Sequence, residues 1–316
     1  MLNMKIFLNL LITWFTCDFI LCLQRFGYSP AEQRLWKRKH KHCSGPNQSP
    51  ISISSRRAVP VNIPAIEFIY YHNLMPTPLK IHNTGHSVSL ITPNDENSTE
   101  IPFVFGGKLQ SEYEYVGLHF HWGERNNKGA EHVINDIRYP LEMHMIHKSK
   151  KYSTVSEALE YKDGLAVLAF FYQIRDADGE EIEGIVRHLR DVGEINDPVS
   201  LPYTFTLGSL IRDVNTQRFY TYRGSLTTPK CNPAVTWIVF PDTIPISLNQ
   251  MARFRSLSNG IEGLLLLDNY RHLQPIGNRK IFLRSVKSRF AKLENLTALE
   301  SSNIDDSNLD DTDPSF

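Results

Sequence analysis

The sequence predicts one strand-dominated α+β domain with short helices at its periphery. Short apolar stretches rich in β-branched and aromatic residues recur along the chain, and Pro, Asn and Gly separate them, which is typical of short strands. Helical patterns are fewer. A length of 316 residues allows two domains, but single β-rich domains reach about 250 residues and no internal repeat is present. We therefore expect one folded domain, over residues 24–290.

The expected elements follow from this alternation of apolar runs and breakers. Strands are predicted at 51–53, 65–71, 79–82, 87–91, 101–104, 115–122, 141–147, 165–174, 203–207, 219–222 and 235–240, and helices at 156–160, 179–189 and 248–256.

The first residues have the character of an export signal. Lys5 precedes a largely apolar run over 6–23, which predicts a secretory signal peptide at residues 1–23 and a secreted, extracellular protein. Asp18 interrupts the run, and no small-x-small cleavage site precedes Gln24. Because 18 residues are near the lower limit for a bilayer span, tethering by an uncleaved N-terminal signal anchor is the alternative.

The last residues differ in composition from the rest. Residues 301–316 hold five aspartates and no lysine or arginine, so we expect residues 291–316 to form a disordered acidic tail. The tail lacks the hydrophobic stretch of a span or lipid-anchor signal, so no C-terminal membrane anchor is expected.

Overall charge excludes some classes of function. The formal net charge is zero, and no aromatic-basic repeat or phosphate-binding glycine loop is present, so no nucleic-acid partner is expected. The basic run at 37–42 is interpreted as a solvated loop, with a docking patch as the alternative. Protein partners are not identifiable from the sequence.

The stretch 115–122 carries the first indication of chemistry. It reads Tyr-Val-Gly-Leu-His-Phe-His-Trp, and strand side chains alternate between faces, so His119 and His121 project from one face. Two imidazoles on one face can bind a metal such as zinc. A His-x-His pair also arises by chance, so the prediction requires a third ligand.

A second apolar run, at 141–147, supplies that third ligand. An antiparallel pairing with 115–122 brings His144 beside His119 and His121, and Glu142 can accept the ring N–H that a metal leaves free. Three imidazoles without a fourth protein ligand are typical of a catalytic zinc site with an open position for water. Taken alone, the same residues are equally compatible with unrelated structural histidines.

Six motifs in the same order resolve this ambiguity, because together they resemble the α-class carbonic anhydrases. The resemblance covers about residues 26–283 and indicates a secreted member; it implies a large, mostly antiparallel, twisted central sheet. The motifs are Asn-Gln-Ser-Pro-Ile at 47–51, Asn-Thr-Gly-His at 83–86, His-Phe-His-Trp-Gly at 119–123, Ala-Glu-His at 130–132, Glu-Met-His at 142–144 and Tyr-Arg-Gly-Ser-Leu-Thr-Thr-Pro at 222–229.

The resemblance implies reversible hydration of CO2 to bicarbonate and a proton by zinc-bound hydroxide. Neutral histidines leave the full charge on Zn2+, so its bound water ionises near neutral pH; the established value for carbonic anhydrase itself is about 7. Thr227 matches the residue that accepts a hydrogen bond from this hydroxide and donates one to Glu131.

Further roles also come from the resemblance. His86 matches the proton shuttle, a role that suits the pKa of histidine. Tyr28, Asn83 and Thr228 match residues that hold an ordered water chain, whereas His132, His147 and His272 are interpreted as structural or exposed. The apolar CO2 pocket, which Thr228 borders, matches Ile146, Val167, Leu226, Val235 and Trp237, residues that would otherwise count as core.

Cysteines and sequons are consistent with export. Cys43 and Cys231 remain after the signal segment, and an even pair favours a disulfide over two buried thiols; secreted carbonic anhydrases join the matching positions. Sequons at Asn97 and Asn295 suit a glycoprotein, whereas Pro50 compromises the one at Asn47.

Three positions depart from the family pattern. Gly117 replaces the usual glutamine that accepts the free N–H of the first zinc histidine, so zinc affinity and ring orientation are in question. Phe26 replaces a tryptophan and Lys230 a proline, both away from the reaction. A non-catalytic adhesion module, using the acidic tail and basic run, is the second functional hypothesis; incidental esterase activity is the third.

Overall fold

The computed structural model describes residues 26–93, 100–195 and 197–285. The predicted export segment, the acidic tail and the sequons at Asn97 and Asn295 lie outside these residues. Among the helices that are described, none has the length and apolar character needed to cross a membrane.

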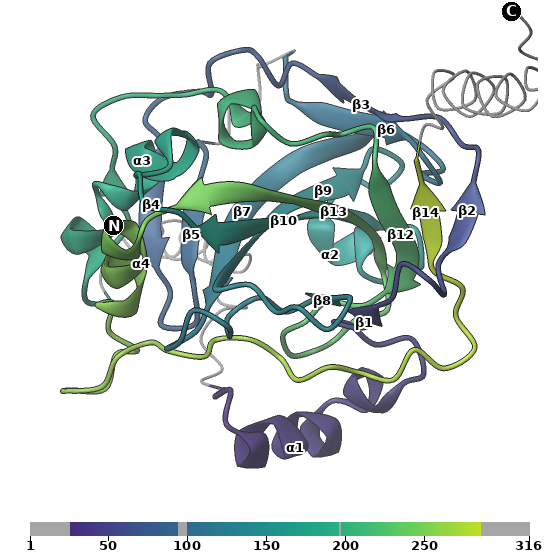
Figure 1. The fold of residues 1–316 in the computed structure, drawn as a ribbon, viewed down its shortest axis with the longest axis horizontal. Helices are drawn as coiled ribbons and strands as arrows, with labels where there is room; N and C mark the ends of the chain where they lie inside the picture. The colour runs from purple at the N-terminus through teal and green to yellow at the C-terminus, as the bar shows by residue number, and fades with distance from the viewer. Residues whose placement is uncertain (1–25, 94–99, 196, 286–316) are drawn as a thin grey trace, which may run out of the picture.

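One large twisted sheet of twelve strands runs through the molecule (Figure 1). Its main path has the order β11-β4-β5-β7-β9-β10-β13-β12-β14-β2, and β6 joins β7 to β3. Most neighbours are antiparallel, whereas β10–β13 and β14–β2 are parallel. A strand-dominated α+β fold with a mostly antiparallel sheet is therefore confirmed.

The strands of this sheet are β2 (Val59–Val61), β3 (Ile66–Ile69), β4 (Lys80–Asn83), β5 (Val88–Ile91), β6 (Phe103–Gly106), β7 (Tyr113–Trp122), β9 (Leu141–Ser149), β10 (Leu165–Ile174), β11 (Val199–Ser200), β12 (Phe219–Gly224), β13 (Val235–Ile246) and β14 (Phe282–Arg284). A separate parallel pair joins β1 (Ser52–Ile53) to β8 (Val133–Ile134).

Both faces of the central strands are covered, and this explains the unbroken apolar run in β10. Along that strand, Leu168 and Phe170 pack into one hydrophobic cluster, while Val167 and Phe171 pack into another on the opposite face. A strand buried on both faces has no polar side to alternate with. The sheet thus separates two cores, and the candidate site lies on the side of the second.

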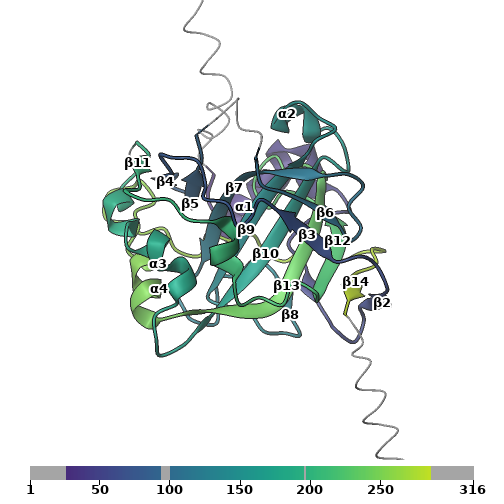
Figure 2. The same ribbon diagram turned by 90° about the horizontal axis from the view of Figure 1, so that it is seen from above.

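The helices are short and lie outside the sheet. They are α1 (Pro30–Lys39), α2 (Val155–Ala158), α3 (Glu180–Val186) and α4 (Leu248–Arg255), with 3-10 turns η2 (Lys41–Ser44), η3 (Leu189–Val192) and η4 (Leu207–Ile211). Figure 2 shows α3 and α4 together at one end of the sheet, where they contact each other.

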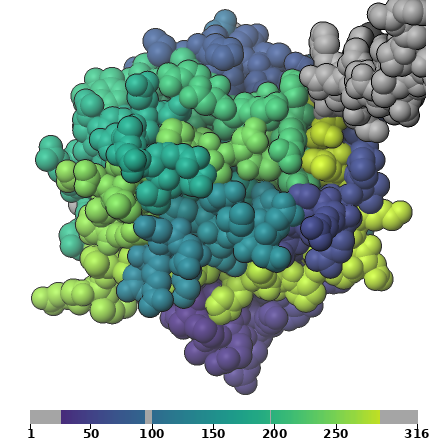
Figure 3. Space-filling model, viewed as in Figure 1, coloured from purple at the N-terminus to yellow at the C-terminus, as the bar shows by residue number. Residues whose placement is uncertain are grey.

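Helix α1 corrects part of the sequence interpretation. Ser29 and Glu32 form a capping box and Pro30 occupies the first turn, a strong start signal that the prediction missed. Lys37, Arg38 and Lys39 form the last turn, where cations stabilise the carboxyl end of a helix. The loop expected over 37–42 is therefore wrong for its first three residues. Figure 3 shows α1 as a purple ridge beside the yellow-green C-terminal described segment.

The strand predicted at 203–207 is also wrong. Thr206 makes only an isolated bridge with Leu74, and its hydroxyl then accepts from the backbone of Ser209 and caps η4. Threonine suits a strand by propensity, but its hydroxyl equally suits a helix start. The edge strand β2 and its neighbour β14 were not predicted, and Pro60 in β2 is typical of an edge position.

Candidate metal centre

Three histidines meet where β7 and β9 pair. Cα register places His119 directly opposite His144, and His121 opposite Glu142. Leu118, on the other face of β7, is buried in the first core and fixes the face that the histidines occupy. Antiparallel pairing therefore produces the predicted convergence.

Ring nitrogens of these histidines point at one another. Nε2 of His119 lies 3.0 Å from Nε2 of His121 and 3.3 Å from Nδ1 of His144. Tetrahedral zinc with Zn–N bonds of 2.0–2.1 Å separates two ligand nitrogens by about 3.3 Å. The donor set and its spacing therefore fit a zinc ion held by Nε2, Nε2 and Nδ1.

Burial keeps these imidazoles in the form that binds metal. Desolvation lowers the pKa of His119 well below its usual value and that of His121 to about 4. The pKa of His144 is also lowered, first by desolvation and against the charge of Glu142. Neutral imidazole is the species that ligates zinc, so the site does not need to lose protons at neutral pH.

The outward nitrogens of two ligands have acceptors. Nδ1 of His121 lies 2.8 Å from the backbone oxygen of Asn269, and Nε2 of His144 lies 2.7 Å from Oε1 of Glu142. Such acceptors fix the tautomer and ring orientation of a ligand. For Nδ1 of His119, no hydrogen-bond acceptor exists among the residues that the structure describes.

Gly117, two residues before His119, explains why His119 lacks, among the described residues, the acceptor that the other two histidines have. A Cβ built at Gly117 would meet only the backbone oxygen of Leu90, at 3.6 Å, which is ordinary contact. Space for a side chain exists, but glycine offers none.

Glu142 belongs to a buried network that the sequence analysis underestimated. Its Oε1 lies 2.7 Å from both His144 and Nδ1 of His132, whose Nε2 lies 2.7 Å from the hydroxyl of Tyr222. Burial alone raises the pKa of Glu142, but the two histidines lower it well below the usual range. His132 thus holds Glu142, the carboxylate that accepts from His144. Its place in the Ala-Glu-His motif is the sequence feature that could have indicated this role.

Glu131 lies against the triad from the other side. Its Oε1 accepts the backbone N–H of Arg271 at 2.8 Å, and its Oε2 is 3.6 Å from Nε2 of His121. Desolvation raises the pKa of Glu131, while the hydroxyl of Thr227 acts in the opposite direction. Glu131 and Thr227 are therefore close enough to interact beside the metal centre. Asn269 and Arg271, which support the site through backbone groups, were not predicted.

The residues predicted to form a pocket wall lie together. Ile146, Val167 and Trp237 are register partners across β9, β10 and β13. The indole of Trp237 packs on His144 with ring centroids 4.8 Å apart. Val235 is buried in the same cluster, and the half-buried Leu226 packs against it.

Four residues were predicted to take part in proton transfer, namely His86, Tyr28, Asn83 and Thr228. His86 lies beside a pair of aromatic side chains: its ring stacks on Phe26 and meets Tyr28 edge-on, with the His86 and Tyr28 centroids 6.4 Å apart. Asn83 is buried, and its amide donates to the backbone oxygens of Ser258 and Gly193. Thr228 is half-buried and its carbonyl accepts from Cys231.

Cys43 and Cys231 form a disulfide with an S–S distance of 2.03 Å. It ties η2 to the loop that follows Thr227, and packs with Trp36. The remaining histidines fit their expected classes: His147 is buried and hydrogen-bonded to Tyr71, and His272 receives support from Gln33 through its backbone N–H.

Comparison with known proteins gives one consistent result. The model of the "Eukaryotic-type carbonic anhydrase" family matches residues 31–285. Carbonic anhydrase 15 of Mus musculus is 37% identical over 254 residues, 78% of this chain and 78% of the relative. Carbonic anhydrase 7 of Mus musculus is 36% identical over 251 residues, covering 78% and 91%. Carbonic anhydrase 4 of Rattus norvegicus is 31% identical over 277 residues, covering 81% and 85%.

Proposed function

The chain belongs to the eukaryotic-type carbonic anhydrase family, and from that premise we propose that it is a zinc enzyme that reversibly hydrates CO2 to bicarbonate and a proton. The convergence of His119, His121 and His144 carries the proposal. When bound, zinc supplies a Lewis acid that makes water a nucleophile at neutral pH.

Thr227 and Glu131 orient the reacting water in this proposal. Burial raises the pKa of Glu131, whereas the backbone N–H of Arg271 that its Oε1 accepts favours the charged form. In this proposal the Thr227 hydroxyl donates a hydrogen bond to this carboxylate. The hydroxyl oxygen of Thr227 can then only accept a hydrogen bond. The reacting water must therefore donate a hydrogen bond to Thr227, which directs a lone pair of the water at the substrate.

Substrate binding relies on apolar surface. CO2 carries no charge, so it gains little from polar groups. Ile146, Val167 and Trp237 form a continuous apolar patch beside His144. With Leu226 and Val235, this patch excludes water from one side of the reacting atoms, and Thr228 borders it.

His86 carries the released proton in this scheme. Histidine suits this role because a solvated imidazole changes charge near neutral pH. The ring of Phe26, from the segment before α1, stacks on the His86 ring and supports it. Tyr28, Thr228 and Asn83 are the neighbours proposed to order the intervening water, Asn83 by holding the turn that carries Gly85.

We also propose that the chain is exported, with a signal segment at 1–23, the enzyme domain at 24–290 and an acidic tail at 291–316. Support comes from the Cys43–Cys231 bond, because disulfides persist mainly in oxidising compartments. Tethering by an uncleaved first segment is the alternative.

Purified full-length mature protein tests the function. We expect one zinc per chain by metal analysis and CO2 hydration by stopped flow, both lost in His119→Ala, His121→Ala and His144→Ala. Stoichiometric zinc without hydration would contradict catalysis and favour the adhesion role. Zinc retained by all three variants after chelator dialysis would contradict the ligand assignment.

A further inference from the structure

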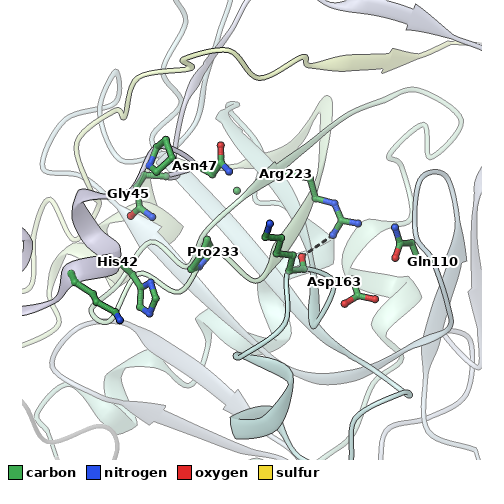
Figure 4. A pocket seen from close by; sticks show the side chains of 12 residues that line it. His42, Gly45, Asn47, Gln110, Asp163, Arg223 and Pro233 are labelled. Atoms are coloured by element: carbon green, nitrogen blue, oxygen red, sulfur yellow. Dashed lines mark hydrogen bonds between the residues drawn. The ribbon is translucent and has the colours of Figure 1, made fainter.

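Away from the metal centre, the structure contains a cavity of about 640 Å³. Three segments supply most of its lining: the turn and loop from Lys41 to Gln48, the Lys162–Asp163 turn, and the end of β12 at Arg223 and Gly224. Gln110 and Pro233 complete it. Figure 4 shows His42 and Asn47 on one side, and Arg223, Asp163 and Gln110 on the other. Two of the six motifs reach the cavity through Asn47, Gln48, Arg223 and Gly224, but the proposed reaction uses none of the residues that line it.

The cavity is positively charged. Lys41, Lys162 and Arg223 line it, together with the imidazole of His42. Asp163 is the one carboxylate among the lining residues, and it already accepts from Nζ of Lys151 at 3.0 Å and from the Tyr152 hydroxyl at 2.8 Å. Burial opposes ionisation of Asp163, but these partners lower its pKa, so it is a charged and occupied acceptor.

Among the residues that the structure describes, the lysines and the arginine that line the cavity have no ion-pair partner. Arg223 donates to the backbone oxygen of Lys162 at 2.8 Å and to the Thr236 hydroxyl at 2.7 Å, both neutral acceptors. Within the described part of the chain, neither Lys41, Lys162 nor Arg223 forms an ion pair. Several cations around one concave surface raise the local potential and attract anions.

The charge distribution of the chain points to an occupant. All 34 lysines and arginines lie before residue 301, whereas five of the 34 acidic residues follow it. The zero net charge therefore divides into a basic body and an acidic tail, in which the aspartates are Asp305, Asp306, Asp310, Asp311 and Asp313. Because single exposed ion pairs are weak, a segment that presents several carboxylates fits the cavity better than one anion.

The tail also has the reach to enter the cavity. Arg284, at the end of β14, pairs with Phe219 of β12, and Arg223 lies four residues further along β12, about 13 Å away. Asp305 follows Arg284 by 21 residues, and a flexible chain of that length spans about 25 Å. Attachment so close to the cavity gives the aspartates a millimolar effective concentration there. We propose that residues 305–313 of this chain dock in the cavity lined by Lys41, Lys162 and Arg223.

Carbodiimide cross-linking of the full chain tests the proposal. The reagent condenses an aspartate with a lysine to an amide, releasing the carboxyl oxygen as a urea. Docking predicts peptides that join Asp305–Asp313 to Lys41 and Lys162. Lys108 is the proximity reference, because its Nζ lies 4.2 Å from the ring centroid of Phe282, where the described chain ends. Cross-links concentrated on Lys108 would show a tethered but undocked tail and overturn the proposal.

Two variants make the test specific. Arg223→Gln leaves every lysine available, and should reduce cross-linking at Lys41 and Lys162 at least threefold. Arg253→Gln, at an exposed arginine that does not line the cavity, should leave it unchanged. Salt at 1 M should abolish the cross-links, because the Debye length falls to about 3 Å. Insensitivity to both Arg223→Gln and salt would contradict docking by charge.

A peptide of residues 301–316 supplies an independent readout. It should bind at least tenfold more tightly to a full chain carrying asparagine at all five tail aspartates than to the parent, in which the tail competes. Equal binding would show that the cavity is open to outside anions and overturn the proposal. Mixing 14N and 15N chains before cross-linking identifies the donor: mixed-isotope products would assign the tail to a second copy instead.

Discussion

The imidazole of His86 stacks on the phenyl ring of Phe26, with ring centroids 3.9 Å apart and the planes inclined by only 6°. Trp36 of α1 packs edge-on against the same phenyl ring, at 5.3 Å. The segment before α1, far away in sequence, therefore positions the histidine assigned to proton transfer.

Replacing His86 should affect proton release without affecting CO2 attack. We expect His86→Ala to slow steady-state hydration at least tenfold in dilute buffer, because proton transfer to solvent becomes limiting. Concentrated imidazole buffer should restore much of the rate, while CO2–bicarbonate exchange at equilibrium stays at the parent value. A loss that buffer does not rescue would assign His86 a structural role.

Removing the hydroxyl of Thr227 should slow hydration while zinc remains bound. Thr227→Ala loses one preorganised hydrogen bond of the transition state, so turnover should fall by roughly two powers of ten. Thr227→Ser retains the hydroxyl and should recover most activity. Stopped-flow rates at measured zinc occupancy check this, and unchanged turnover in Thr227→Ala would exclude the residue from the mechanism.

Supplying the missing acceptor for His119 should strengthen zinc binding. Gly117→Gln places an amide oxygen on the same face of β7, where a Cβ meets no close neighbour. Losing such an acceptor costs about 10–100-fold in metal affinity, so zinc dissociation into chelator should slow about tenfold. Val116→Gln, at an exposed neighbouring position, is the control and should leave the rate unchanged.

The disulfide should contribute much of the stability. Its cysteines are 188 residues apart, so it restrains a long loop of the unfolded chain. Joint replacement of Cys43 and Cys231 by serine should lower the free energy of unfolding by about 2–5 kcal/mol in urea titrations. An unchanged midpoint would show that the reduced chain is equally restrained.

His147 should make the fold sensitive to acid. Burial lowers its folded-state pKa to about 3, whereas an unfolded histidine titrates near 6.5. Between these values the unfolded chain binds a proton that the folded chain does not, so stability is complete above pH 6.5 and falls with pH through this window. His147→Gln should reduce the slope of unfolding free energy against pH by up to 1.4 kcal/mol per unit. Parallel slopes for both proteins would contradict this assignment.

The sequence was most informative where one local pattern determines the structure. Period-two alternation in β7 placed His119 and His121 on one face, and pairing with β9 followed from a second apolar run. The continuous apolar run of β10 likewise appears as a strand with the predicted bounds, Leu165–Ile174.

It was least informative where partners are distant. The acceptor for His121 is a backbone oxygen, that of Asn269, 148 residues later, and backbone groups carry no residue-specific signal. His132 looked like an isolated histidine because its partners, Glu142 and Tyr222, come together only in the fold. At 203–207, strand propensity and helix capping competed, and the Thr206 hydroxyl caps η4.

The position of β14 has a consequence for biosynthesis. β14 lies between β12 and β2, so that residues 59–61 acquire their neighbour in the sheet only through residues 282–284. Because a ribosome releases the chain from its amino end, β2 remains unpaired at this edge until almost the whole domain has been translated. The sheet can therefore be completed only after residues 282–284 have left the ribosome, and until then the nascent chain carries an exposed strand edge of the kind that chaperones protect from aggregation.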